Sequence, residues 1–397
     1  MKIAILTSGI LPVPAVQGGA VEALVDYLLE YNDKHSLHDI TVYSVLNPDV
    51  FRQEALQSCV NHYVYIDTGS LLGRAGKRLH GLLHRRTYYH YSIDYFLKRA
   101  LRLIRRQHFD VIILENRPGY ALKLYGKTDA QLVYHLHNDF LNSATQDAAA
   151  LYRIATGILT VSDFIRSRVL TCNAQDSKTF TIHNGINLAP FAAPPALSRD
   201  SLGLSSDDFV LLFSGRLVEE KGILQLVEAM QKLSDHPKIK LLVMGSSFYG
   251  NANDNNPFIR QLKLKTAGCE EQIKFTGFVQ HDLMASYLGL SDVAVIPSIW
   301  NDPFPTTVLE GMAAGLPIIT TDRGGISEMA TPENAVILPC GADLADHLAK
   351  AILSLYQDKE GRERMGKASK ELSYKYSKEN YAKHFFDAIA LLAARGK

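Results

Sequence analysis

Short runs of apolar residues alternate with longer segments of helical periodicity along most of the chain. The runs hold three to six residues, are rich in Val, Ile and Leu, and stay apolar at successive positions. Strands that are covered on both faces of a parallel sheet have this pattern. The expected strands are residues 3–6, 40–45, 111–114, 132–136, 158–161, 210–213, 239–244, 273–275, 293–296, 318–320 and 335–338.

Helical segments such as 21–31 and 224–233 separate these runs, which predicts an α/β fold with right-handed crossovers and a doubly wound parallel sheet. The repetition restarts once, after a segment of 187–206 that contains three prolines and no strand pattern. We therefore expect a domain over 1–190, a second over 205–375, and a closing amphipathic helix within 376–397 that can cross back to the first domain. Ligands bind beyond the carboxyl ends of such strands, so a cleft between the domains is the expected site.

Composition narrows the class of protein. The chain has 397 residues, of which 47% are apolar and 21% charged, and this excludes disordered, collagen-like and coiled-coil proteins. The four cysteines, Cys59, Cys172, Cys269 and Cys340, lie far apart, so neither a disulfide framework nor a zinc site is expected. Without a leader-like or membrane-spanning segment, we expect a cytoplasmic protein.

The formal net charge of +1 conceals a basic segment over 73–108, which carries ten Lys or Arg and a single acid, Asp94. Within it, residues 94–106 form an expected amphipathic helix, and leucines around 71–83 interleave with further cations. An anionic membrane or a nucleic acid would attract such a patch, and a solvated helix face is the third interpretation. Because no aromatic stacking platform accompanies it, we favour a peripheral membrane or acceptor patch over nucleic acid. Its members are Arg99, Arg102, Arg105 and Arg106.

Two glycine-containing loops follow expected strands. Gly18 and Gly19 precede the first helix, where they either bring backbone amides close to an anion or sugar, or serve a turn with positive φ. In the second half, Gly215 opens a loop with Arg216 and Lys221. Two cations together at the carboxyl end of a strand are better explained as a binding site for a diphosphate than as two unrelated surface charges.

The most informative segment is 297–317, where a strand, a loop and a helix that starts near Thr306 follow one another. The first-turn amides at Thr306 and Thr307 are available for phosphate oxygens. Asp302 in the loop and Glu310 in the helix can accept hydrogen bonds from hydroxyls, which indicates a ribose and a hexose. The alternatives are a helix N-cap for Asp302 and a surface position for Glu310.

These motifs together resemble retaining nucleotide-sugar glycosyltransferases of the GT-B architecture, family GT4, over nearly the whole chain. The segment from Asp302 to Glu310 resembles the E-x7-E element of that family. The other matching elements are Gly18 with Gly19, residues 181–187, Gly215 with Arg216, Lys221 with Gly222, residues 275–279 and residues 313–317.

Three positions depart from the family pattern. Asp302 stands where the family has the first Glu, and Asn187 where it has Asp. The strand end at Gly245 is followed by a polar insertion through Asn256 instead of a second close glycine. These departures bear on donor preference.

The resemblance implies two Rossmann-like domains, the first for the acceptor and the second for the nucleotide sugar. It implies that Arg216 and Lys221 neutralise the leaving diphosphate and that Asp302 contacts the transferred sugar. Glu310 would hold the ribose hydroxyls. His137 matches a donor-contacting histidine of the family, although a structural role is the alternative for a histidine at a strand end. The implied donor-binding positions also include Gly18, Gly19, Gly215, Gly245, Phe278, Thr306 and Thr307.

We expect a retaining transfer that needs no metal or other cofactor, because cations and helix amides already stabilise a departing diphosphate. The donor is expected to be a uridine diphosphate sugar, and the acceptor a glycan or lipid-linked glycan of a cell-surface polysaccharide. No nucleic-acid partner is expected. Two alternatives stay open: a nucleotide-sugar epimerase of GT-B fold, and a catalytically silent partner subunit that binds nucleotide sugar or glycan.

Overall fold

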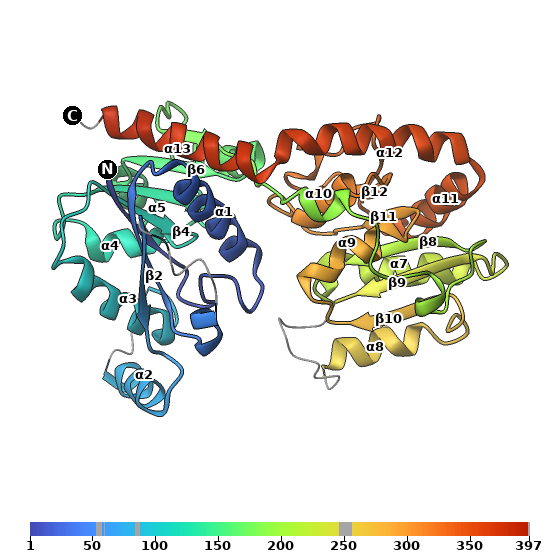
Figure 1. Ribbon diagram of the computed structural model, residues 1–397, viewed down its shortest axis with the longest axis horizontal. Coiled ribbons are helices and arrows are strands. Elements are labelled where there is room, and N and C mark those ends of the chain that lie inside the picture. Colours follow the sequence, from blue (N-terminus) through green and yellow to red (C-terminus); the bar gives the residue numbers. More distant parts are fainter. Residues whose placement is uncertain (53–57, 59, 84–87, 246–255, 396–397) are drawn as a thin grey trace. The chain divides into compact units, whose positions relative to one another are not determined.

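The computed structural model describes residues 1–52, 58, 60–83, 88–245 and 256–395. Cys59, Arg85, Arg86 and the insertion at 246–255 therefore lie outside the described residues. The chain forms two compact units, of which the first contains Met1–Gly185 and Lys378–Lys397 and the second contains Ile186–Ser377. Each unit has its own parallel sheet (Figure 1).

The first unit is built on a sheet whose described strands are ordered β3-β2-β1-β4-β5-β6-β7, all parallel. The strands are β1 (Lys2–Leu6), β2 (Asp39–Val45), β3 (Asn61–Ile66), β4 (Val111–Glu115), β5 (Gln131–Leu136), β6 (Gly157–Thr160) and β7 (Thr179–Thr181). The five apolar runs expected in this half are confirmed as strands. The edge strands β3 and β7 were not expected, because β3 begins with polar residues and β7 has only three residues.

The helices of the first unit include one that is far from the others in sequence. They are α1 (Ala20–His35), α2 (Leu71–Leu83), α3 (Tyr91–Ile104), α4 (Ala121–Leu124), α5 (Ala148–Ile154), α6 (Asp163–Leu170) and α13 (Lys378–Arg395). Helix α13 lies beside α1 over one face of the sheet (Figure 1). Its Tyr381, Phe385 and Ile389 join Leu24 and Leu28 of α1 in one buried core. The amphipathic pattern of the chain end is thus satisfied within the first unit.

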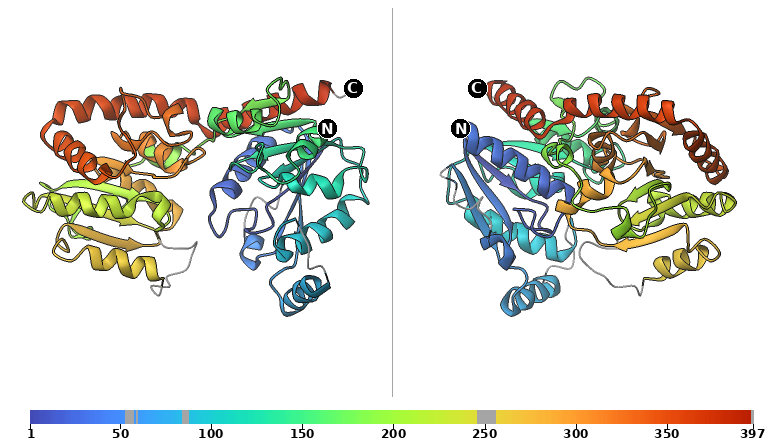
Figure 2. Two further views of the ribbon diagram at one scale, coloured as in Figure 1. Left: turned by 180° about the vertical axis from the view of Figure 1, so that it is seen from behind. Right: turned by 45° about the vertical axis from the view of Figure 1, so that its right-hand side comes forward.

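Helix α2 differs from the other helices of this unit, because it extends outward from the body of the unit (Figure 2). Gly73 and His80 face inward, and the His80 Nε2 atom lies 2.8 Å from the Asp94 carboxylate of α3. All five of its leucine side chains are exposed to solvent; these are Leu71, Leu72, Leu79, Leu82 and Leu83. The helix therefore presents an apolar surface that no described residue covers.

The second unit repeats the same architecture with the strand order β10-β9-β8-β11-β12-β13, again parallel among the described strands. The strands are β8 (Phe209–Ser214), β9 (Ile239–Met244), β10 (Ile273–Gly277), β11 (Val293–Ile296), β12 (Ile318–Thr321) and β13 (Ala335–Leu338). The helices are α7 (Ile223–Lys232), α8 (Pro257–Lys265), α9 (His281–Gly289), α10 (Thr306–Ala313), α11 (Leu344–Gln357) and α12 (Lys359–Ser373). All six apolar runs of this half are confirmed as strands.

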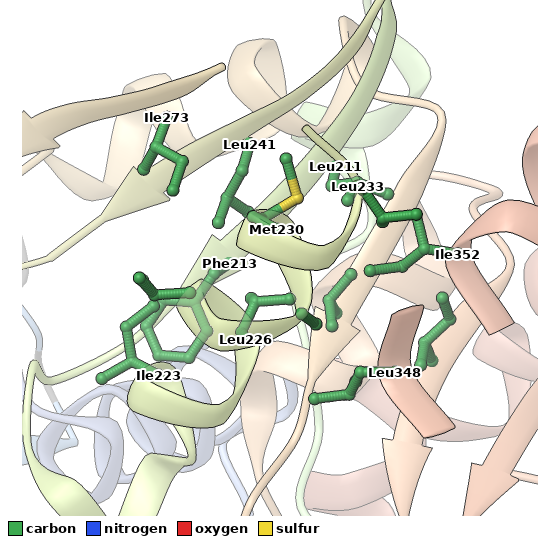
Figure 3. Close-up of a cluster of buried hydrophobic side chains, with 14 of the residues drawn as sticks. Leu211, Phe213, Ile223, Leu226, Met230, Leu233, Leu241, Ile273, Leu348 and Ile352 are labelled. Carbon is green, nitrogen blue, oxygen red and sulfur yellow. The ribbon is translucent and has the colours of Figure 1, made fainter. Parts of the chain in front are cut away.

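One face of the second sheet packs against α7 and α11 (Figure 3). Phe213 and Leu241 of the strands meet Leu226 and Met230 of α7, while Ile352 comes from α11. These side chains are almost completely buried, so the burial of apolar area holds the β8–α7 connection in place. The loop between β8 and α7 is the one that carries Arg216 and Lys221.

The two sheets show the doubly wound parallel fold expected from the alternating pattern. In each sheet the strand order reverses between the first and fourth strands of the unit, which are β1 and β4 in one and β8 and β11 in the other. Ligands of such sheets bind beyond the carboxyl ends of the strands at this reversal. No described helix combines the length and hydropathy needed to cross a bilayer.

Candidate active site

The loop after β8 is shaped by two glycines. Gly215 and Gly222 have φ angles of 151° and 71°, and a Cβ on Gly222 would overlap the carbonyl oxygen of Pro297. Gly222 thus lets this loop approach the end of β11 more closely than any other residue would. Between the two glycines, the side chain of Arg216 is exposed and Lys221 is half-buried.

Hydrogen bonds and an ion pair connect the loop after β11 to the loop after β8. The backbone N–H of Ile299 donates to the carbonyl oxygen of Glu220 at 3.0 Å, and the Ser298 hydroxyl donates to the same oxygen at 3.3 Å. The Lys221 ammonium forms an ion pair with the Asp302 carboxylate and lies 6.0 Å from the centre of the Trp300 ring. The structure thus brings together Lys221 and Asp302, which are 81 residues apart.

Asp302 is buried and is not the N-cap of the following helix, since Pro305 occupies that position. Its backbone oxygen accepts a hydrogen bond of 2.8 Å from Gly325, and a Cβ on Gly324 would overlap that same oxygen. The N-cap interpretation of Asp302 is therefore wrong. The carboxylate is held by the fold at a fixed place beside a cation.

Helix α10 begins at Thr306, as expected, with no side-chain cap hydrogen bond. The first-turn amides at Thr306 and Thr307 lack partners within the helix, as in every α-helix, and both side chains are half-buried. Glu310 is buried, with an exposed fraction of 6%, so it is not the surface residue of the alternative interpretation. Burial raises the pKa of Glu310 to about 8.

The ends of β9 and β10 adjoin the loop after β8. The Gly215 N–H donates to the Met244 carbonyl oxygen at 3.0 Å, and the Gly245 N–H donates to that of Gly277 at 2.9 Å. A Cβ on Gly245 would overlap the Gly215 oxygen. Phe278 follows directly, with 48% of its surface exposed, so its ring is available for a planar ligand.

In the first unit, Gly18 and Gly19 form the turn before α1. Both have positive φ angles, of 76° and 106°, and the Gly18 N–H donates to Ala15 at 2.9 Å. A Cβ on Gly19 would overlap the carboxylate of Glu22. Burial raises the pKa of Glu22 to about 7, and its carboxylate accepts a hydrogen bond of 3.4 Å from Ser8.

His137 lies just after β5 in a buried cluster with Glu115 and His135. Its Nε2 atom is 2.9 Å from Glu115, and the His135 Nδ1 atom is 3.0 Å from the same carboxylate. Burial and the neighbouring His135 lower the pKa of His137 to about 4, so its ring is neutral at pH 7. The Asn116 side chain accepts from the His137 backbone N–H at 3.2 Å, and Tyr381 of α13 stacks on His135.

The ligand atoms of Glu115, His135 and His137 lie close enough together to surround a metal ion. Both histidines already bind the carboxylate through one ring nitrogen, so the cluster is a continuous hydrogen-bond network. It is better suited to holding His137 in one orientation than to admitting an ion.

The strand end at β4 was missed by the sequence analysis. Glu115, Asn116 and Arg117 follow one another there, and Asn116 has a left-handed φ of 55°. A polar residue at the end of a wholly buried strand, with two more directly after it, was the available signal. The patch expected for membrane or acceptor lies elsewhere in this unit: Arg99 and Arg102 are exposed on α3, and Arg105 and Arg106 are exposed directly after it.

Comparisons with known proteins cover both units. The family model for glycosyl transferases group 1 matches residues 196–372, and that for glycosyltransferase family 4 matches 18–190. Spore coat protein SA of Bacillus subtilis is 28% identical over 93% of this chain and 94% of its own. The lipopolysaccharide 1,2-N-acetylglucosaminetransferase of Salmonella typhimurium is 25% identical over 70% and 72%. Among solved structures, Anabaena Alr3699/HepE in complex with UDP and glucose has a TM-score of 0.74 at 19% identity, covering 98% and 99%.

Proposed function

Because the chain is a GT4-type glycosyltransferase of the GT-B fold, we propose that it transfers a sugar from a uridine diphosphate donor to a glycan or lipid-linked glycan. One observation carries the proposal. At the strand-order reversal of the second sheet, the loops after β8 and β11 hold Lys221 against Asp302, with Arg216 on the same loop as Lys221. This is the place where such sheets bind ligands, and it combines cations with a hydroxyl-binding carboxylate.

Each group has a role that follows from its chemistry. Arg216 and Lys221 stabilise the negative charge that develops on the diphosphate as its bond to the sugar breaks, and the α10 amides add their dipoles. Asp302 accepts hydroxyl hydrogen bonds from the transferred sugar, while Glu310 and the exposed ring of Phe278 hold the ribose and the base. The departing phosphate can accept the acceptor proton on the same face, so transfer with retention requires no protein nucleophile. Since these cations supply the electrostatic stabilisation, no metal ion is needed.

The kind of donor and acceptor is supported by the relatives. Anabaena HepE was solved with UDP and glucose, and the Salmonella relative is named for transferring N-acetylglucosamine to lipopolysaccharide. We therefore place the chain in the synthesis of a cell-surface polysaccharide.

The test is a transfer assay with UDP-glucose, UDP-N-acetylglucosamine and UDP-galactose, in the presence and absence of EDTA. We expect one donor to be consumed at an EDTA-independent rate, with an NMR spectrum that shows the donor's anomeric configuration in the product. Lys221→Ala and Arg216→Ala should each lower turnover about 100- to 1,000-fold. Lys350→Ala, which removes an exposed lysine of α11, is the control and should leave the rate unchanged.

Full activity in Lys221→Ala would contradict the assigned role. Conversion of the donor to its epimer without an acceptor would favour the epimerase. Binding of UDP without transfer or hydrolysis of any donor would favour a silent partner subunit.

We also infer that α2 and α3 attach the protein to an anionic membrane, where a lipid-linked acceptor would lie. At 100° per residue, the exposed leucines of α2 fall within an arc of about 120°, beside Arg74 and Arg78. Leu72 has 85% of its surface exposed and Leu71 has 82%. An apolar face flanked by cations is typical of helices that lie in the membrane interface.

A further inference from the structure

The loop after β4 holds an arginine between two aromatic rings. The Arg117 guanidinium carbon lies 5.1 Å from the centre of the Tyr89 ring and 5.7 Å from that of the Phe140 ring. Both distances are within the range of cation–π attraction. The rings therefore keep a long, flexible side chain in one place, at the strand-order reversal of the first sheet.

The charge and the hydrogen-bond donors of this guanidinium are not taken up by other described residues of the protein. Among the described residues, Arg117 has no ion-pair partner, and its buried Nε atom has no hydrogen-bond acceptor. Glu22 is near enough to Arg117 for their charges to interact, and Glu115 lies two residues before Arg117, but each carboxylate is engaged elsewhere. Glu115 binds the two histidines, and Glu22 accepts from Ser8. A planar guanidinium with unused donors is suited to the paired oxygens of a phosphate or carboxylate.

The surroundings of Arg117 are aromatic and are themselves fixed. The Gly119 N–H donates to the Tyr89 hydroxyl at 2.9 Å, and the Tyr88 hydroxyl donates to Gln146 at 2.8 Å. Phe140 has 39% of its surface exposed. A sugar ring has apolar C–H faces that pack on such rings, so an aromatic surface beside a cation suits a charged sugar.

The same loop also sets the position of His137. Asn116, which precedes Arg117, adopts its left-handed conformation and accepts a hydrogen bond from the His137 backbone. A ligand on Arg117 would thus lie on the loop that fixes His137, the histidine for which the family resemblance implies a donor contact.

We propose that Arg117, Tyr89 and Phe140 form the acceptor subsite and bind an acceptor sugar through an anionic group, either a phosphate or a carboxylate. The inference rests on the proposed function and adds the chemical class of the acceptor to it. It requires no bond to form or break at this subsite.

The experiment is a calorimetric titration of the full chain saturated with UDP, so that the diphosphate site is filled. The probes are glucose 1-phosphate, glucuronic acid and the neutral methyl α-glucoside. We expect one of the anionic probes to bind at least 10-fold more tightly than the neutral one. Glucose 1-phosphate as the tighter ligand would identify a phosphorylated acceptor, and glucuronic acid an acidic sugar.

Arg117→Gln should weaken binding of the anionic probe about 10- to 100-fold and leave binding of the neutral probe unchanged. Arg166→Gln removes an exposed arginine of α6 in the same unit and should behave as the wild type. Arg117→Lys keeps the charge without the planar fork and should restore part of the affinity. Unchanged binding in Arg117→Gln, or no preference for anionic probes, would overturn the subsite.

Failure of this subsite can be distinguished from failure of the proposed function. If the wild type binds the anionic probe but neither binds UDP nor transfers sugar, and Arg117→Gln no longer binds that probe, the subsite is supported and the proposed function is contradicted. If transfer occurs and Arg117→Gln keeps the same KM for a charged acceptor, the subsite alone fails. Should Arg117→Gln fold poorly, Phe140→Leu removes one supporting ring and is expected to weaken the same probe.

Discussion

Replacing Glu310 by Gln should change the pH dependence of stability in a way that can be calculated. Glu310 is buried, and burial raises its pKa from 4.5 to about 8. Between these values the folded chain holds a proton that the unfolded chain has released, so its stability falls as the pH rises and levels off above pH 8. At about 1.36 kcal/mol per pH unit, the loss is about 5 kcal/mol. Gln cannot ionise, so Glu310→Gln should escape this loss.

The assay is urea unfolding between pH 5 and pH 9, followed by tryptophan fluorescence. Trp300 is the only tryptophan of the chain and lies beside Lys221 in the same unit, so it reports on the correct domain. The free energy of unfolding of wild type minus that of Glu310→Gln should decrease by several kcal/mol across this range. Glu360→Gln, at an exposed position of α12, should remain parallel to the wild type. Parallel curves for Glu310→Gln and wild type would refute the reasoning.

Three further variants test other parts of the structure. Gly222→Ala should lower the melting temperature of the second unit, because its Cβ would overlap the Pro297 oxygen and the φ of 71° disfavours alanine. An unchanged melting curve would contradict this and show that the loop can move aside. Glu115→Gln should destabilise the first unit by roughly 2 to 3 kcal/mol at pH 7. Its two histidine contacts lower the pKa of Glu115 to about 2 against the effect of burial, so this difference should shrink in urea titrations as the pH falls below 4. The double variant Leu72→Ser/Leu83→Ser should sediment less with phosphatidylglycerol vesicles than the wild type does. Leu264→Ser, at an exposed leucine of the second unit, is the control. Equal sedimentation of the double variant and the wild type would contradict membrane attachment through α2.

The sequence was sufficient for most of the fold because both sheets are buried on both faces. Every apolar run expected to be a strand is one, since a strand under helices on both sides has few polar positions. The pattern failed only at the two edges of the first sheet. Strand β3 has one neighbouring strand and carries Asn61 and His62, and three-residue β7 is too short to form a recognisable run.

At the candidate site, the sequence suggested residues for a chemical role but did not predict what they contact. Arg216 and Lys221 were predicted as site residues from their place after a strand, and the structure adds that Lys221 pairs with Asp302. The burial of Glu310 could not be read from the sequence, because a charged residue on an amphipathic helix is usually exposed. Its raised pKa follows from that burial alone.

Strand order explains why the second unit was easier to interpret than the first. In both sheets the order reverses between the first and fourth strands, and in both units polar side chains gather there. Lys221 and Asp302 follow the strands at one reversal, while Glu22 and Arg117 follow those at the other. The first pair lies in motifs that the proposed diphosphate site requires, whereas the proposed acceptor subsite has no such common chemistry. Two charged residues 95 positions apart can be connected only once β1 and β4 are known to be neighbours.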